Sequence, residues 1–224
     1  MFQPPRVVTV MEPWDALRMP PSELVSSVRS ELLSTQRLSR GRLDVAALAE
    51  GKVRWCRDGE KPVDVSASDE TIIGVKLPGY WRLLELLPDT RFVVCVREPA
   101  EILESFEGTG GRLRRGLEYE CAFYADLNGR LLRSTSEDAE RRALLLEESL
   151  SAIMSSMDRP NVHVLRYERW FEDPDTVVSE LGKFLEVDLA PGTIEITQPR
   201  SREVDPKTVA LVAEKVPSAT DLGY

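Results

Sequence analysis

Four short runs of apolar, β-branched residues constrain the fold more than any other feature of this sequence. They lie at residues 6–10, 71–76, 91–97 and 161–166. The runs are largely continuous rather than alternating, which is typical of strands buried on both faces of a parallel sheet. Patterns typical of helices separate them, so the chain is predicted to fold as an α/β protein with a parallel sheet.

The sequence between and after these runs predicts five helices, at residues 21–38, 80–87, 99–106, 137–157 and 174–185. Pro21 lies in the first turn of the first helix, where its missing N–H costs no hydrogen bond. Pro88 stops the second helix, and Asp173 is the expected N-cap of the last one. Residues 51–69 and 108–116 are polar or glycine-rich and are predicted loops.

Length and charge limit the classes of function. A chain of 224 residues suits one domain, so residues 1–224 are predicted to form a single domain. Its 29 Lys and Arg residues face 38 Asp and Glu residues, and the net charge of −9 argues against nucleic acid or an anionic membrane as a partner. A local basic pocket can still hold a small anionic ligand. No apolar run reaches the ~18 residues of a membrane span, and residues 1–10 carry no evident secretion signal, so we expect a cytoplasmic location.

The cysteines and the single histidine exclude further classes of site. Cys56, Cys95 and Cys121 are odd in number and lack the spacing of a disulfide framework or a cysteine-based zinc site. His163 lies in a strand-like run without a nucleophile elbow, which argues against a histidine-rich metal site and a Ser-His-Asp triad. Acid–base chemistry in an enzyme of this sequence would therefore fall to a carboxylate or a lysine.

The most informative stretch surrounds Arg97. A buried strand ends at this residue, Pro99 opens a helix, and Ser105 follows eight residues after Arg97. Ligands of open parallel sheets bind beyond the carboxyl ends of the strands, where an arginine can hold an anion with its two-pronged guanidinium. The alternative is structural, with Arg97 capping the strand through a salt bridge to Glu98 or Glu101. Spacing alone does not choose between the two interpretations.

A second stretch contains a strand, a turn and an amphipathic helix between residues 165 and 187. It holds the pair Tyr167-Glu168, the acidic turn at Asp173 and a helix that ends in Phe184-Leu185. Together with Arg97 and Ser105, this order resembles the sulfotransferases that use 3′-phosphoadenosine 5′-phosphosulfate (PAPS). The resemblance spans residues 7–187 and implies a three-layer, P-loop-like α/β fold with a central parallel sheet flanked by helices.

The resemblance also implies roles for the matching residues. Arg97 and Ser105 would bind the 3′-phosphate of the nucleotide, and Tyr167 would lie near the adenine. Lys76, in a segment similar to the family's K-x-P element, would stabilise the charge that develops on the departing phosphate. The alternatives are a core aromatic at Tyr167 and a surface lysine before a turn at Lys76.

Two further segments match the family less specifically. Arg200 and Arg202 occupy the place of a late basic loop that closes over the 3′-phosphate, although short Arg/Ser loops are also common on solvated surfaces. Glu12 lies in a strand-and-turn segment similar to that of bacterial and carbohydrate-type members, where the carboxylate removes the acceptor's proton. Its alternative is a plain turn carboxylate beside Pro13, and Asp15 is a weaker substitute for the base.

One family element is missing from the sequence. We find neither the loop that binds the 5′-phosphosulfate at a helix N-terminus nor a Walker motif. The resemblance therefore implies that an N-terminal βα unit of about 30 residues is missing upstream, going by the size of such units. Either the chain is a truncated enzyme or it is a natural short form. The loss would expose strand edges that invite pairing with another chain, so a homo-oligomer is one expectation.

The resulting expectation is a PAPS-dependent sulfotransferase that acts on a hydroxyl of a small molecule or carbohydrate and needs no metal. Its alternative is a non-catalytic, sulfotransferase-like remnant that binds a nucleotide or a partner. A P-loop kinase relative is a third interpretation, which the missing Walker residues disfavour.

Overall fold

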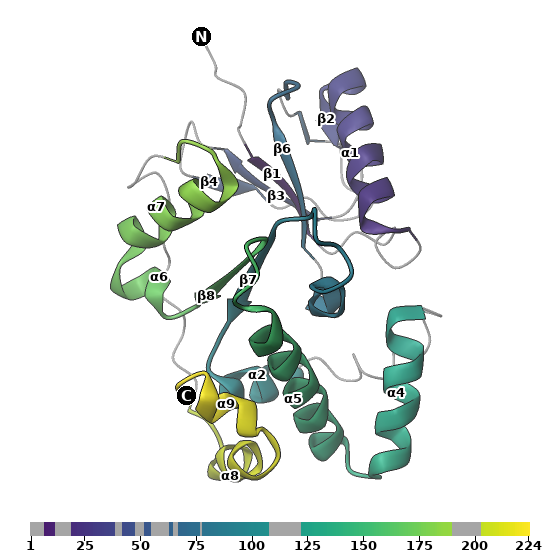
Figure 1. Cartoon of the computed structure of the whole chain (residues 1–224), viewed down its shortest axis with the longest axis vertical. Coiled ribbons are helices and arrows are strands. Elements are labelled where there is room, and N and C mark those ends of the chain that lie inside the picture. The colour runs from purple at the N-terminus through teal and green to yellow at the C-terminus, as the bar shows by residue number, and fades with distance from the viewer. Residues whose placement is uncertain are drawn as a thin grey trace. The chain divides into compact units, whose positions relative to one another are not determined.

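The computed structural model describes residues 7–11, 19–38, 42–47, 52–54, 63–64, 67–76, 78–107, 122–189 and 203–224 of the chain (Figure 1). It divides into two compact units. Unit 1 comprises residues 1–78 and 178–196, and unit 2 comprises residues 79–177 and 197–224. The prediction of a single domain stays a prediction.

Unit 1 contains a four-stranded sheet in the order β4-β3-β1-β6. Its strands are β1 (Val7–Met11), β3 (Arg42–Ala47), β4 (Lys52–Arg54) and β6 (Ile72–Lys76). β1 and β6 are parallel, with Val7 opposite Ile72 and Met11 opposite Lys76. β3 runs antiparallel to both β1 and β4. Two short antiparallel strands, β2 (Arg37–Leu38) and β5 (Val63–Asp64), pair separately.

Helix α1 (Pro21–Thr35) packs on β6 through one buried stripe. Leu24, Val28 and Leu32 recur every four residues and are fully buried, as expected for the inner face of an amphipathic helix. The helix ends because Gln36 adopts a left-handed conformation (φ 52°), a common helix terminator. The Gln36 amide exchanges hydrogen bonds with the main chain of Ala67, at 2.8 Å and 3.2 Å, which ties the helix end to the segment before β6.

Unit 2 is built on the parallel pair β7 (Phe92–Val96) and β8 (Val162–Arg166), which lie side by side in Figure 1. Its other elements are the 3₁₀ helix η2 (Pro78–Leu83), α2 (Pro99–Glu107), α4 (Ala122–Ser134), α5 (Asp138–Ser156), α6 (Arg169–Glu172), α7 (Pro174–Leu185), α8 (Pro206–Lys215) and α9 (Pro217–Asp221). The first residue of η2 and the part of α7 from Val178 onward belong to unit 1.

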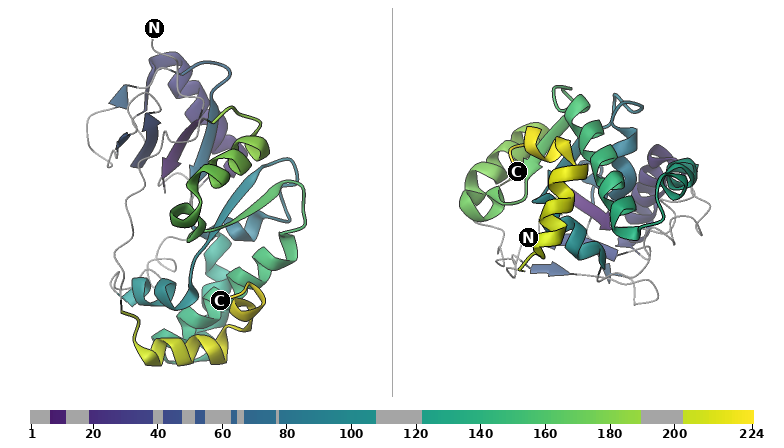
Figure 2. Two further views of the ribbon diagram at one scale, coloured as in Figure 1. Left: turned by 90° about the vertical axis from the view of Figure 1, so that its left-hand side faces the viewer. Right: turned by 90° about the horizontal axis from the view of Figure 1, so that it is seen from below.

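The core of unit 2 joins residues of β7, β8 and four helices. Figure 2 shows α8 and α9 beside α5, and α2 contacts both α5 and α8. The buried cluster consists of Leu84, Val96, Ala100, Leu103, Ala143, Leu146, Leu150, Ile153, Val162, Val212, Val216 and Ala219. One aliphatic core therefore fixes the carboxyl end of β7 against the first turn of α2.

The predicted α/β class with parallel strand pairing is confirmed, and several details differ. The helices predicted at 99–106, 137–157 and 174–185 are present as α2, α5 and α7, and the Asp173 carboxylate caps α7 by accepting the Thr176 N–H at 3.2 Å. The sheet of unit 1 is mixed rather than purely parallel, because β3 inserts beside β1.

Two local predictions need correction. The short helix predicted at 80–87 is a 3₁₀ helix that begins earlier, at Pro78, and ends at Leu83, before a turn. The segment predicted as a loop at 51–69 contains β4 and β5, which are short strands stabilised by pairing with other segments. Among the helices of the described residues, none combines the length and apolar character needed to cross a membrane.

Candidate functional site

The strand pair of unit 2 brings Arg97 and Tyr167 together. Val96 and Arg166 are opposite each other at the carboxyl ends of β7 and β8, and the Tyr167 N–H donates to the Val96 carbonyl at 2.7 Å. This bond carries the ladder one residue past the end of β8. Because parallel strands end at the same edge of a sheet, the residues that follow them meet there.

Arg97 is partly buried and already has a charged partner. Its guanidinium carbon lies 5.0 Å from the centroid of the Tyr167 ring, a cation–π distance. One Nη of Arg97 forms an ion pair with the carboxylate of Glu101, which lies in the first turn of α2. The two side chains are 31% and 28% exposed. The buried Nε of Arg97 has no hydrogen-bond partner among the described residues, so the guanidinium keeps donor capacity for a further acceptor.

Glu98 fixes the turn between β7 and α2. Its carboxylate accepts the N–H groups of Ala100 at 3.1 Å and of Glu101 at 2.6 Å, so that it acts as the N-cap of α2. Pro99 follows at the first helical position. A carboxylate at this end is also favoured by the helix dipole. The first N–H groups of α2 are therefore engaged by the protein itself.

Glu168 and Tyr224 complete this neighbourhood. The Glu168 carboxylate accepts the Glu98 N–H at 3.0 Å through Oε1 and the Tyr224 O–H at 3.1 Å through Oε2. The Arg166 guanidinium lies 4.5 Å from the Tyr224 ring centroid. Burial, together with the Glu168 charge and hydrogen bond, raises the pKa of Tyr224 to about 12. The phenol therefore stays protonated, and remains a donor, at neutral pH.

An open pocket of ≈ 460 Å³ adjoins these groups. It is lined by Glu98, Glu101, Arg166, Tyr167, Glu168, Phe171, Glu172 and Tyr224. The Tyr167 and Phe171 rings meet edge to face, with centroids 5.1 Å apart, and form an aromatic wall. The wall can take a flat ring, and the neighbouring arginine can take an anion. Of the carboxylates in the lining, Glu101 pairs with Arg97, and Arg166 packs against the Tyr224 ring.

Ser105 lies on α2, two turns beyond Arg97. Its hydroxyl donates to the Ile102 carbonyl at 2.7 Å, a bond within its own helix. The described contacts bring Arg97 to Glu101 and Tyr167. Joint binding of a phosphate by Arg97 and Ser105 therefore stays a prediction.

The other predicted residues lie in unit 1 or outside the described residues. Lys76 is the last residue of β6, is exposed, and pairs in register with Met11 of β1. Glu12 follows Met11 in the sequence but lies outside the described residues, as do Arg200 and Arg202. Their predicted roles stay untested by the geometry.

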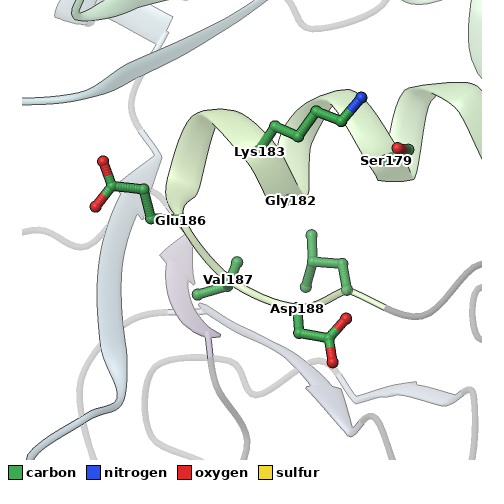
Figure 3. Close-up of a pocket in the computed structure, with 7 residues that line it drawn as sticks. Ser179, Gly182, Lys183, Glu186, Val187 and Asp188 are labelled. Atoms are coloured by element: carbon green, nitrogen blue, oxygen red, sulfur yellow. The ribbon is translucent and has the colours of Figure 1, made fainter.

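A second open pocket, of ≈ 420 Å³, lies at the end of α7 (Figure 3). Lys183 and Ser179 project from the helix beside it, and Asp188 lies on the turn that follows. This turn packs closely: Glu186 is left-handed (φ 58°), and a side chain at Gly182 would come within 2.9 Å of the Val187 carbonyl. The pocket is bounded by the last turns of α7 and the turn that follows them, and we assign it no chemistry.

Sequence reasoning missed the parts played by Glu168 and Tyr224. The Tyr167-Glu168 pair was identified for its tyrosine, and nothing marked the segment around Tyr224. The sequence signal that could have pointed to Glu168 is its position directly after an aromatic residue at the end of a strand. Among the described residues, no group of three or more His, Cys, Asp or Glu side chains is placed to hold a metal ion.

The family of the chain follows from comparison with known proteins. The model of the family described as "Sulfotransferase family" matches residues 12–191, which is most of the sequence and includes the Arg97, Tyr167 and α7 segments. The chain therefore belongs to the sulfotransferase family. A comparison with curated proteins finds no match.

Two of the solved structures that are similar to the chain are sulfotransferases. One is a sulfotransferase from Alicyclobacillus acidocaldarius, with 20% identity over 70% of this chain and 66% of that chain and a TM-score of 0.41. The other is the sulfotransferase domain from the curacin biosynthetic pathway, with 18% identity over 70% of this chain and 52% of that chain and a TM-score of 0.39. The chain thus spans just under two thirds of the first protein and about half of the second.

Proposed function

We propose that this protein transfers a sulfuryl group from PAPS to a hydroxyl of a small molecule or carbohydrate. The observation that carries the proposal is the contact between Arg97 and Tyr167 at the carboxyl ends of two parallel strands, in a chain of the sulfotransferase family. A cation beside an aromatic ring suits a ligand that joins a phosphate to a planar base. PAPS carries both, on one ribose.

The proposed nucleotide contacts combine the Arg97–Tyr167 geometry with the roles that the family resemblance implies. Arg97 binds the 3′-phosphate with help from the Ser105 hydroxyl, and the Tyr167 ring lies near the adenine. Arg200 and Arg202 add charge from the late basic segment. The phosphate must compete with Glu101 for the guanidinium, because that carboxylate is the present partner of Arg97.

The proposed transfer is an in-line displacement at sulfur. The acceptor oxygen forms a bond to sulfur while the bond between sulfur and the bridging phosphate oxygen breaks. Glu12 takes the proton from the acceptor hydroxyl, and adenosine 3′,5′-bisphosphate leaves. The Lys76 ammonium stabilises the charge that develops on the departing phosphate oxygen. The reaction written in this way requires no metal.

Calorimetry with adenosine 3′,5′-bisphosphate tests the nucleotide assignment. We expect the wild type to bind, and Arg97→Ala to weaken binding ~10- to 100-fold, the usual worth of hydrogen bonds to a charged group. Arg91→Ala is the matched control, because it removes the same charge just before the other end of β7. Equal affinity of Arg97→Ala and wild type would overturn the assignment. Tighter binding of ATP than of the bisphosphate would favour a kinase-like activity.

The second candidate is a module that binds a nucleotide or a partner without catalysing transfer. The ion pair between Arg97 and Glu101 favours it, because this pair gives the arginine a structural role. A labelled-sulfate assay with PAPS and a panel of hydroxyl acceptors separates the two. Transfer that is lost in Lys76→Ala supports the enzyme. Nucleotide binding without transfer to any acceptor supports the module.

A further inference from the structure

We propose that Glu168 is a positioning residue for Arg97, and that the Tyr224 hydroxyl holds the Glu168 carboxylate in place. This inference takes a nucleotide as the ligand of Arg97, and in that respect it rests on the proposed function. In its geometry, it rests on contacts within unit 2 alone.

The first contact substitutes for a missing capping bond. In a capping box, the glutamate three residues after the N-cap residue accepts the main-chain N–H of that residue. Here the N-cap is Glu98 and the third residue is Glu101, whose carboxylate instead pairs with Arg97. Glu168, 70 residues away in the sequence, accepts the Glu98 N–H in its place. The start of α2 is therefore held by a residue that follows β8, while Glu101 pairs with Arg97.

The second contact orients Glu168 from the other side. The Tyr224 hydroxyl donates to Oε2, so both carboxylate oxygens of Glu168 are engaged. Tyr224 is itself held by its main-chain N–H, which donates to the Ala219 carbonyl at 3.0 Å, and by the Arg166 guanidinium against its ring. Gly223 adopts φ +80°, a conformation that favours glycine, and this allows the chain to turn back toward β8.

α9 anchors this segment to the core of unit 2. The Ser218 N–H and hydroxyl donate to the two oxygens of Glu147 on α5, at 3.1 Å and 2.8 Å. Val216 and Ala219 belong to the buried cluster. The segment that carries Tyr224 is thus anchored to the core of unit 2, and the Tyr224 hydroxyl is linked to the Glu98 turn through the Glu168 carboxylate.

The consequence for Arg97 follows from two adjacent pairs. Arg97 contacts Tyr167, and the next residues, Glu98 and Glu168, contact each other. Loss of the Glu168 carboxylate removes the contact with Glu98, so the adjacent contact between Arg97 and Tyr167 is held less firmly. Arg97 then samples more orientations, and the anion loses a preorganised partner.

The experiment compares Glu168→Ala, Glu168→Gln, Tyr224→Phe and the control Glu172→Gln, which changes a carboxylate in the same pocket. Binding of adenosine 3′,5′-bisphosphate is measured by calorimetry well below the melting temperature of each variant. We expect Glu168→Ala to raise Kd ~10-fold and Tyr224→Phe ~3-fold, the worth of one or two such hydrogen bonds. Glu168→Gln should bind no more weakly than the wild type, because its amide oxygen still accepts the Glu98 N–H and its amide NH2 can donate to the Tyr224 oxygen. Glu172→Gln should not weaken binding.

The direction of the effect separates positioning from simple electrostatics. Removal of a negative charge near an anion site strengthens anion binding if charge alone matters. Weaker binding in Glu168→Ala, rescued in Glu168→Gln, therefore supports the inference. Binding in Glu168→Ala that equals or exceeds that of the wild type would overturn it and leave the proposed function intact.

A ligand-free measurement keeps the two proposals apart. Hydrogen exchange at the Glu98 amide, followed by NMR, should speed up in Glu168→Ala and Tyr224→Phe but not in Glu168→Gln. If the wild type binds no bisphosphate, the nucleotide proposal fails. The exchange rates alone then decide whether Glu168 and Tyr224 hold the Glu98 turn in place. Unchanged exchange in all the variants would overturn the inference.

Discussion

The two strand ends that carry the predicted chemistry are built differently. Arg97, after β7, lies between the Tyr167 ring and the Glu101 carboxylate on a turn fixed by Glu98 and Glu168. Lys76, at the end of β6, is exposed. A cation that must recognise a fixed ligand benefits from such preorganisation. In the proposed function Lys76 has a different task, which is to stabilise the charge that develops on the departing phosphate oxygen. The comparison suggests that binding and transfer can be separated by mutation.

The largest expected effect is on transfer, and it tests this separation directly. Lys76→Ala should lower the rate of sulfuryl transfer ~100- to 1000-fold, the range for loss of one group that stabilises developing charge. Its Kd for adenosine 3′,5′-bisphosphate should change little. The measurement pairs a labelled-sulfate assay with calorimetry. A parallel loss of binding and transfer would show that both strand ends serve the nucleotide.

The next-largest expected effect is on the free energy of unfolding, measured for one core variant in each unit. Leu32→Ala removes a fully buried side chain of α1, and Leu150→Ala removes one from the buried cluster on α5. Each should lower the free energy of unfolding by ~2–5 kcal/mol. Because α7 contributes residues to both units, we expect one cooperative transition in chemical denaturation that both variants shift. Two transitions, of which each variant shifts only one, would contradict the single-domain prediction.

A smaller effect concerns the present partner of Arg97. Glu101→Gln should tighten binding of adenosine 3′,5′-bisphosphate, by up to ~5-fold, because a partly exposed ion pair is worth at most about 1 kcal/mol. The control is Glu172→Gln, which should tighten it less. If Glu101→Gln weakens binding, then the carboxylate orients the guanidinium for the ligand rather than competing with it.

The smallest effect is on the titration of Tyr224. Its pKa is raised from 10.0 to about 12, so the stability that it contributes is complete below pH 10 and is lost as the pH rises to about 12. Glu168→Gln should lower this pKa, because the Glu168 charge and hydrogen bond are two of its causes. Ultraviolet difference titration against the same variant with Tyr224→Phe isolates this phenol. An unchanged pKa would indicate that burial alone sets it.

Local patterns were sufficient for the parallel strands and for the helices α1, α2, α5 and α7. Residues 71–76, 91–97 and 161–166 are apolar enough that strand formation needs no knowledge of their partners. β3 and β4 escaped prediction because each mixes charged with apolar residues, and their strand conformation depends on pairing with β1 and with each other.

The contacts of the candidate site also divide into local ones, which the sequence predicted, and long-range ones, which it did not. The Arg97–Glu101 pair is local, one helical turn apart, and was one of the two alternatives in the sequence. The contacts of Glu168 join residues 70 and 56 positions apart. No spacing rule predicts these contacts, since they arise only when the parallel strands and α9 come together in the folded unit.

The ion pair at the site has a consequence for selectivity. An arginine that is already neutralised gains little from chloride or free inorganic phosphate, since either ion only exchanges one negative partner for another. A ligand succeeds there when it brings additional contacts on the same molecule, such as a ring for Tyr167. If Arg97 binds the nucleotide as proposed, the Glu101 pair therefore disfavours small anions that bring no contact besides their charge.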